Sequence, residues 1–340
     1  MKPYIAFIGT NSVRGSQGIY TLGIQPEDLQ AELLSTTPAF NTGALTLSAD
    51  GRFLYAASEG MTFQGKASGG AYAFSIGEGG RLTRLNGTIT HGQRPCSVDT
   101  DPAGSFLYAA NFFGQSLAFL PIREDGSLAP LSRLITETAV RGFMGGLHSV
   151  RTLDGGRTVG VICMGSGELI LYDAESGDRS AAFTFAESKH ARHFTASQDG
   201  RLLYVLMQSP PEAAVLRRNP DGSMTLLQEI SLVPEPAGWT GASTLQLTPD
   251  GSLLLAADRD TSTIAVFRVG PDGLLTLSDS VPLPGKTPRD FCISPDGRLV
   301  VTALQASDSV CVHEIDYENG TLLQRCAGLP VPSPAAVRIL

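Results

Sequence analysis

A turn containing Asp-Gly or a similar pair, followed by an apolar strand, recurs six times along this chain of 340 residues. The copies read LSADGRFLYAASEG, TDPAGSFLYAANFF, TLDGGRTVGVICMG, ASQDGRLLYVLMQS, LTPDGSLLLAADRD and ISPDGRLVVTALQA. Their anchoring glycines are Gly51, Gly104, Gly156, Gly200, Gly251 and Gly297. A spacing of about fifty residues is typical of the four-stranded blades of a β-propeller.

A second theme of strand, polar turn and strand follows each copy and occurs seven times, beginning with GIYTLGIQPEDLQAELL. The missing seventh copy of the first theme can be assembled from PSPAAVRIL at the C-terminus and PYIAFIGT at the N-terminus. The sequence therefore predicts an all-β, seven-bladed β-propeller with four-stranded antiparallel blades. We expect one domain over residues 1–340, with a channel along its axis and a last blade closed by strands from both termini.

Composition limits the partners and the compartment. The formal net charge of −8 argues against nucleic acid or an anionic membrane surface as the partner. The five cysteines show no CxxC spacing, which is typical of free thiols in a reducing compartment. The apolar run in MKPYIAFIGTNS is too short for a signal peptide or a membrane span, so we expect a cytoplasmic protein.

Residues at the same distance from the repeated glycines should occupy equivalent places around the axis. Eight positions before each glycine stand Gly43, Cys96, His148, Arg192, Ser243 and Arg289, with Ala335 as the inferred seventh member. Eight positions after it stand Glu59, Phe112, Met164, Gln208, Arg259 and Gln305, with Thr10 as the inferred seventh. Arg192 and Gln208 are then the two ends of one hairpin, and both should point toward the same channel mouth.

The predicted ring is cationic although the protein is acidic. Arg192, Arg259 and Arg289 come from consecutive blades, and arginine suits bidentate recognition of carboxylate or phosphate oxygens. A small anionic metabolite is therefore the predicted partner. The alternative for any one arginine is a structural brace between blades. His193 follows Arg192 and should face the opposite way in an extended strand, as a packing or hydrogen-bonding residue.

Other chemistries lack their motifs. The chain has no GxSxG elbow, no Walker glycine loop, no zinc spacing and no complete calcium loop, so we expect neither a metal nor a cofactor. Cys96 occupies a ring position and could act as a nucleophile. The interpretation as a small buried residue is favoured.

The sequence resembles the seven-bladed propeller lactonases, which include a bacterial type of 6-phosphogluconolactonase and the 3-carboxy-cis,cis-muconate lactonizing enzyme. The segments that carry the resemblance are GIYTLGI, LYAASE, RPCSVDTDPAGSFLYAANFFG, LHSV, ARHFTASQDG, LTPDGSLLLAADRDTSTIAVF and TPRDFCISPDG. The resemblance implies a site formed by His148, Arg192, Arg259 and an acid at position 208. Here that position is Gln208, and glutamine cannot act as a general base. The base would then be His148 or Glu59, or the activity has been lost.

The leading hypothesis is hydrolysis or formation of a small anionic lactone, such as 6-phosphogluconolactone or a carboxymuconate lactone. Arg192 and Arg259, with Arg289, would hold the anion and stabilise the oxyanion. His148, titrating near neutrality, would move the proton. Gln208 and Glu59 would position water or hydroxyl groups. Cys96 and Ser243 complete the predicted substrate-binding set.

Two other classes of function remain open on sequence grounds. The same arginine mouth could capture a small anionic metabolite without turnover, and the glutamine at position 208 favours that alternative. A protein-interaction propeller is the third class. The blades lack the Gly-His and Trp-Asp pairs of the common scaffolding propellers, which argues against it.

Overall fold

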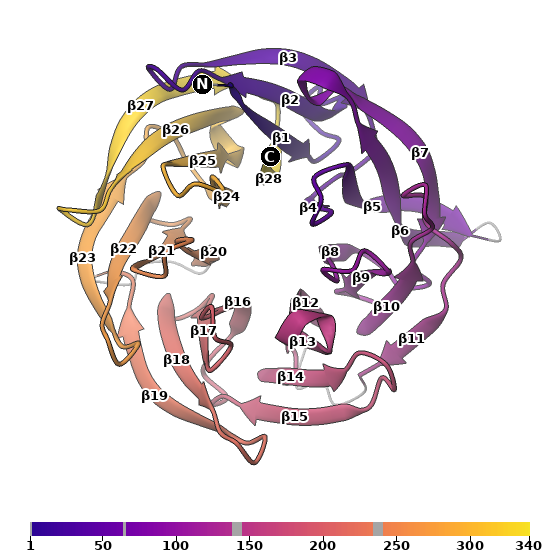
Figure 1. Ribbon diagram of the computed structural model, residues 1–340, viewed down its shortest axis with the longest axis vertical. Coiled ribbons are helices and arrows are strands. Elements are labelled where there is room, and N and C mark those ends of the chain that lie inside the picture. Colours follow the sequence, from indigo (N-terminus) through magenta and orange to yellow (C-terminus); the bar gives the residue numbers. More distant parts are fainter. Residues whose placement is uncertain (1, 64–65, 138–144, 234–240) are drawn as a thin grey trace.

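The computed structural model describes residues 2–63, 66–137, 145–233 and 241–340, and it shows seven four-stranded antiparallel sheets arranged in a ring (Figure 1). The predicted seven-bladed β-propeller is confirmed. In the described part of the chain, helical structure is limited to three 3₁₀ turns, η1 (Glu78–Gly80), η2 (Asp154–Gly156) and η3 (Gln305–Ser307). None of the helices in these ranges has the length and apolar character needed to cross a membrane.

The blades are numbered along the chain, with strands given from the axis outward. Blade 1 has β28 (Pro334–Ile339), β1 (Tyr4–Thr10), β2 (Gly18–Ile24) and β3 (Ala31–Pro38). Blade 2 has β4 (Ala44–Leu47), β5 (Phe53–Phe63), β6 (Lys66–Ile76) and β7 (Leu82–Ile89). Blade 3 has β8 (Pro95–Thr100), β9 (Phe106–Asn111), β10 (Ser116–Pro121) and β11 (Arg133–Thr136).

The remaining blades follow the same order. Blade 4 has β12 (Leu147–Leu153), β13 (Thr158–Cys163), β14 (Glu168–Asp173) and β15 (Arg179–Thr184). Blade 5 has β16 (Ala191–Ala196), β17 (Leu202–Met207), β18 (Glu212–Arg218) and β19 (Met224–Ser231). Blade 6 has β20 (Ala242–Leu247), β21 (Leu253–Asp258), β22 (Thr263–Val269) and β23 (Leu275–Pro282). Blade 7 has β24 (Pro288–Ile293), β25 (Leu299–Leu304), β26 (Ser309–Asp316) and β27 (Thr321–Pro330).

The repeated glycine ends the turn between the first and second strand of a blade. All six glycines have φ between 68° and 92°, a left-handed conformation that costs glycine little. In four of these turns the preceding aspartate accepts a hydrogen bond from the backbone N–H two residues later; they are Asp50, Asp199, Asp250 and Asp296. The Asp-Gly pair is therefore explained by local turn chemistry, independently of any function.

The hydrophobic core lies between neighbouring blades. It consists of seven clusters, and each joins side chains of two adjacent sheets. The cluster between blades 6 and 7, for example, contains Leu255, Val266 and Phe291. Central strands such as β21 are buried throughout, whereas the outermost β15 is largely exposed. The blades are therefore held as a ring by apolar contacts, which places the seven innermost strands around one axis (Figure 1).

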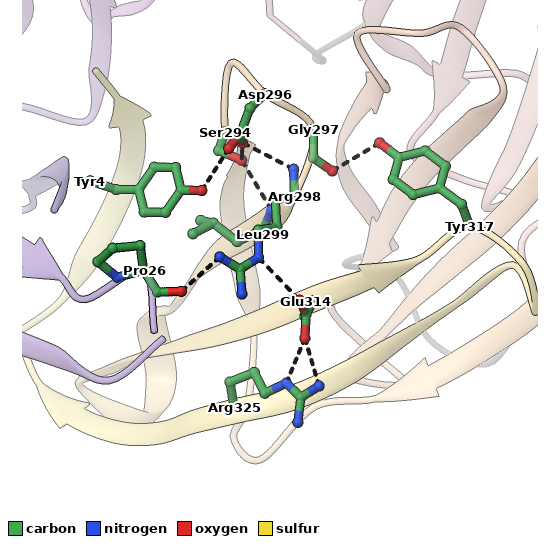
Figure 2. A network of polar contacts seen from close by, with 10 residues as sticks. All are labelled: Tyr4, Pro26, Ser294, Asp296, Gly297, Arg298, Leu299, Glu314, Tyr317 and Arg325. Atoms are coloured by element: carbon green, nitrogen blue, oxygen red, sulfur yellow. Dashed lines mark hydrogen bonds and ion pairs between the residues drawn. The ribbon is translucent and has the colours of Figure 1, made fainter. Parts of the chain in front are cut away.

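The two termini close the ring together. In blade 1 the C-terminal β28 pairs antiparallel with the N-terminal β1, with Val337 opposite Ile8, as the sequence predicted. Figure 2 shows a second connection between blades 7 and 1. The Tyr4 hydroxyl donates to Asp296 over 2.6 Å, and Arg298 Nη1 donates to the carbonyl oxygen of Pro26 over 2.7 Å. The main-chain pairing thus joins the two ends of the chain within blade 1, and the polar contacts link blade 7 to that blade.

Deletion of residues 334–340 should destabilise the whole ring. The deletion removes β28, leaves the edge of β1 unpaired and uncovers apolar side chains of blades 1, 2 and 7. We expect a fall in Tm of more than about 10 °C, or loss of the cooperative transition, in a calorimetric melt. Deletion of Leu340 alone is the control, because it leaves β28 intact. Equal melts for the two deletions would contradict the proposed role of the closure.

Candidate active site at the channel mouth

Six of the seven ring residues predicted eight positions before a glycine lie at an irregularity in an innermost strand, and Gly43 is the exception. In six blades the pairing register shifts there, so that one residue of the inner strand has no partner opposite it. The six extra residues are Cys96, His148, Arg192, Ser243, Arg289 and Ala335. Such β-bulges re-aim a side chain. The repeat therefore encodes a ring of bulged positions, which explains why their spacing from the glycines is informative.

The bulge in β16 also overturns the expectation for His193. The register shifts between Ala191 and His193, so strict alternation of side chains is lost at Arg192. Below the cavity described next, the channel narrows to a space of about 40 Å³, here called the stem. Arg192 and His193 both line the stem. The rings of His148 and His193 lie with their centroids 5.2 Å apart. His193 therefore faces the channel, and the prediction that it faces the opposite way is wrong.

A cavity of about 440 Å³ occupies one mouth of the channel. Six of the eight predicted site residues line it: Glu59, Cys96, His148, Arg192, Gln208 and Arg289. Ser243 and Arg259 do not belong to its lining. This volume suits a small metabolite.

Arg192 is held rigidly at the mouth by two hydrogen bonds. Its Nε donates to the carbonyl oxygen of Ser243 over 2.8 Å, and its Nη1 donates to Gln208 Oε1 over 2.7 Å. Gln208 is itself fixed by the close approach of Gly241. A Cβ at Gly241, where φ is +50°, would lie 1.7 Å from the backbone carbonyl oxygen of Gln208. Only glycine fits there, so Gly241, just before β20, helps to position the Arg192–Gln208 pair.

The other two predicted members from blade 6 have different surroundings. Ser243 is fully buried, and its hydroxyl donates to the carbonyl oxygen of Pro288 over 2.5 Å. It braces blade 6 against blade 7, which corrects the prediction that it contacts substrate. Arg259 lies beside the cavity, where its Nε donates to the carbonyl oxygen of Gly241 over 2.9 Å. Burial and the neighbouring Arg289 lower the pKa of Arg259 to about 10.

The three ring arginines repel one another. Arg192 is only 4% exposed, and burial, followed by the charges of Arg289 and Arg259, holds its pKa well below the usual value. Within the described residues, no hydrogen bond or ion pair engages the Arg289 guanidinium. Its pKa is lowered mainly by burial. An anion entering this mouth would relieve the repulsion among the three arginines and would give Arg289 a partner. These electrostatics favour the binding of an anion at this mouth.

His148 is buried at the base of the cavity. Among the described residues its Nδ1 has no hydrogen-bond partner. Burial, followed by the charges of Arg192 and His193, holds its pKa well below 6.5. The expectation that His148 titrates near neutrality is therefore wrong, because it is already neutral at pH 7. A neutral imidazole can accept a proton, so the free protein presents His148 as a base.

Cys96 is not placed as a nucleophile. Its thiol points at backbone carbonyl oxygens, 3.4 Å from that of His148 and 3.6 Å from that of Leu147. Burial raises its pKa to about 11, although Arg192 and Arg289 act in the opposite direction. The thiol is therefore protonated at neutral pH, which argues against a nucleophilic role. Cys96 is partly exposed and lines the cavity, so its contact with substrate stays a prediction.

Alkylation of the native protein should report this protection. With a pKa of about 11, only about a thousandth of Cys96 is thiolate at pH 8, so iodoacetamide should modify it slowly. Cys326, which is also partly exposed, is the internal comparison. Peptide mass spectrometry should find Cys326 modified at least tenfold faster in the native state, with the difference lost in denaturant. Equal native rates would contradict the account of Cys96.

Sequence reasoning missed Arg94, which lines the cavity two residues before Cys96. Arg94 Nε lies 3.2 Å from Glu59 Oε1, and the two side chains are 45% and 35% exposed. The guanidinium also lies 5.2 Å from the centre of the Phe113 ring. Arg94 has a left-handed backbone, with φ of 54°, before the strand begins, so the offset rule did not reach it. Glu59 therefore forms an ion pair with Arg94 at the rim of the cavity, which argues against Glu59 as the general base.

The family model described as lactonase, 7-bladed beta-propeller matches residues 5–339. The chain belongs to the seven-bladed β-propeller lactonase family. The match spans every blade, so the lactonase fold accounts for all the described strands.

Relatives of this lactonase include two bacterial 6-phosphogluconolactonases. It is 28% identical over 360 residues to the 6-phosphogluconolactonase of Bacillus subtilis, covering 100% of this chain and 99% of the relative. It is 26% identical over 336 residues to the 6-phosphogluconolactonase of Formosa agariphila, covering 93% and 94%. The periplasmic gluconolactonase of Pseudomonas aeruginosa is a structural neighbour, with a TM-score of 0.91, 26% identity and coverage of 100% and 99%.

Proposed function

We propose that this protein hydrolyses a sugar lactone that carries an anionic group, with 6-phosphogluconolactone as the preferred substrate. The observation that carries the proposal is Arg289, which has no partner among the described residues, beside buried Arg192 in a cavity that also contains the neutral base His148. Family membership supports the reaction, and the names of the Bacillus and Formosa relatives support the phosphorylated substrate.

The arginines would act on the substrate in two ways. One guanidinium binds the phosphate as a charge-assisted pair, and Arg289 suits this role because its N–H groups are uncommitted among the described residues. Arg192 is fixed by Ser243 and Gln208 and can face the lactone carbonyl without reorganising. As water adds to that carbonyl, negative charge develops on its oxygen, and a preorganised cation stabilises it.

His148 would carry the proton. The neutral imidazole accepts a proton from the attacking water as the new C–O bond forms. The tetrahedral intermediate then collapses, the bond to the ring oxygen breaks, and the imidazolium returns the proton to that oxygen. The product is the open acid. Surrounding arginines disfavour the imidazolium, so it should give up the proton readily.

Gln208 would orient rather than titrate. Its side-chain oxygen, Oε1, accepts a hydrogen bond from Arg192. This leaves the two N–H groups of the side-chain amide to donate to a hydroxyl or water in the cavity. Glu59 would contact substrate hydroxyls at the rim together with its partner Arg94. In this assignment the reaction proceeds without a carboxylate base at position 208.

The substrate assignment is tested by comparing two lactones that differ in the phosphate. Acid release from 6-phosphogluconolactone and from glucono-δ-lactone is followed with a pH indicator and corrected for the spontaneous reaction. We expect kcat/KM to be at least about tenfold higher for the phosphorylated lactone, because one charge-assisted pair contributes about 1.5–3 kcal/mol. Equal values would contradict the phosphate assignment while leaving the lactonase activity in place.

A further inference from the structure

The opposite mouth of the channel contains a second set of inward-facing residues. They stand three positions after the bulged residues, so the same sevenfold repeat brings them together on the other side of the narrow stem. They line a separate hollow of about 440 Å³. Its charged members are Asp99, Arg151 and Arg338, and Thr195 and Cys292 lie between them. This hollow plays no part in the proposed lactonase reaction.

Arg151 supplies a cation at this second mouth. Within the described ranges, neither a hydrogen bond nor an ion pair engages its half-buried guanidinium. Arg338 comes from β28, three blades away around the ring, and its Nη1 lies 3.2 Å from Asp290 Oδ2. The charged lining of the hollow is two arginines and one carboxylate, Asp99, so the cations outnumber the anions and an added anion is favoured.

Both arginines act on the same space at the axis. Burial and the charge of Arg192 lower the pKa of His193 most, and the charges of Arg151 and Arg338 lower it further. The same two charges oppose the rise in pKa that burial causes in Cys292. The acidic residues nearby already have donors. Asp99 accepts from the backbone N–H of Thr152 over 2.8 Å, and Asp290 accepts from the backbone N–H of Val337 over 3.0 Å. Among the described residues, the Arg151 guanidinium therefore remains available to a ligand, whereas Arg338 already pairs with Asp290.

The two mouths are separate sites. The stem between them has a volume of only about 40 Å³, which is close to the space of a single water molecule. Its walls include His148, Arg192 and His193. The space between the mouths is therefore too small to hold a ligand of more than a few atoms. A site at the second mouth must therefore fill and empty from its own face of the propeller.

We propose that the second mouth is an anion-binding site for a phosphate group, either inorganic phosphate or a small phosphomonoester. Arg151 supplies the principal charge, with its planar donors matched to two phosphate oxygens. Arg338 adds a second charge across the axis, and the Thr195 hydroxyl is a neutral donor beside them. The volume exceeds that of phosphate alone, so a short organic substituent also fits.

Equilibrium dialysis with radiolabelled inorganic phosphate at low ionic strength tests the proposal. The variants are Arg151→Gln at the second mouth, Arg289→Gln at the first mouth, and Arg201→Gln as an exposed control outside the channel, where the side chain is 81% exposed. We expect Arg151→Gln to weaken one class of phosphate site at least tenfold, and Arg289→Gln to leave that class intact. Arg201→Gln should bind phosphate as the wild type does.

The proposal is overturned if the wild type binds no phosphate, if Arg151→Gln binds as the wild type does, or if Arg289→Gln abolishes all binding. Cooperative melts of each variant exclude unfolding as a cause. Displacement of phosphate from the Arg151-dependent site by glycerol phosphate would identify a phosphomonoester as the ligand class. Failure to displace it would assign the site to free phosphate. None of these readings depends on lactone turnover.

Discussion

Replacement of Arg192 by glutamine is expected to lower kcat/KM for 6-phosphogluconolactone by about 10²–10³-fold. Arg192 is buried, hydrogen-bonded in one orientation and surrounded by like charge, so its interaction with a developing oxyanion should be strong. Removal of one preorganised oxyanion donor typically has an effect of this size. The measurement is the initial rate of acid release over a range of lactone concentrations.

The matched control for this substitution is Arg201→Gln. Arg201 is exposed in the turn before β17, in the same blade as Arg192, and should give a rate within twofold of the wild type. A cooperative melt of Arg192→Gln would show that lost activity does not come from unfolding. If Arg192→Gln retained more than a third of the wild-type kcat/KM, the assigned role of the guanidinium would be wrong.

Replacement of His148 by alanine should lower kcat by about 10²–10⁴-fold, because loss of a positioned general base has that cost. The wild-type pH dependence gives an independent check. The pKa of His148 is lowered, so its base form persists as the pH falls, and the acid limb of kcat/KM should lie below pH 6.5. Glucono-δ-lactone is the substrate for this profile, because none of its groups titrates between about pH 5 and 8.

Two results would exclude His148 as the base. One is a His148→Ala variant with wild-type kcat. The other is an acid limb at or above pH 6.5, which would belong to a group other than this buried imidazole. His91→Ala is a suitable control, because His91 is exposed in a turn before β8 and lies outside the cavity lining.

The architecture could be predicted almost completely from the sequence, because propeller blades repeat a local pattern. The Asp-Gly turn requires a positive φ, and an apolar strand follows it in every copy, so the repeat is visible without any long-range contact. Closure by both termini could be predicted because six copies of one theme accompany seven of the other. Because the blades are pseudo-symmetric, residues at the same distance from the repeated glycine occupy equivalent positions around the axis. This rule predicted that His148, Arg192 and Arg289 line the channel mouth.

Other features of the site depend on contacts that the repeat does not encode. The bulge in β16 turned His193 toward the channel, and regular alternation could not predict it. The pKa of His148 is set by burial among arginines from other blades. Ser243 holds a ring position, yet it faces the backbone of blade 7. Arg94 lies in an irregular segment before β8, outside the repeated pattern.

The central claim is that the arginine mouth catalyses lactone hydrolysis rather than only binding an anion. The most direct measurement is the rate of acid release from freshly prepared 6-phosphogluconolactone with catalytic amounts of wild-type protein, compared with buffer alone. The account predicts multiple turnovers at a rate far above the spontaneous hydrolysis. A rate equal to that of buffer, together with a rise in Tm on adding 6-phosphogluconate, would contradict it and identify a binding protein.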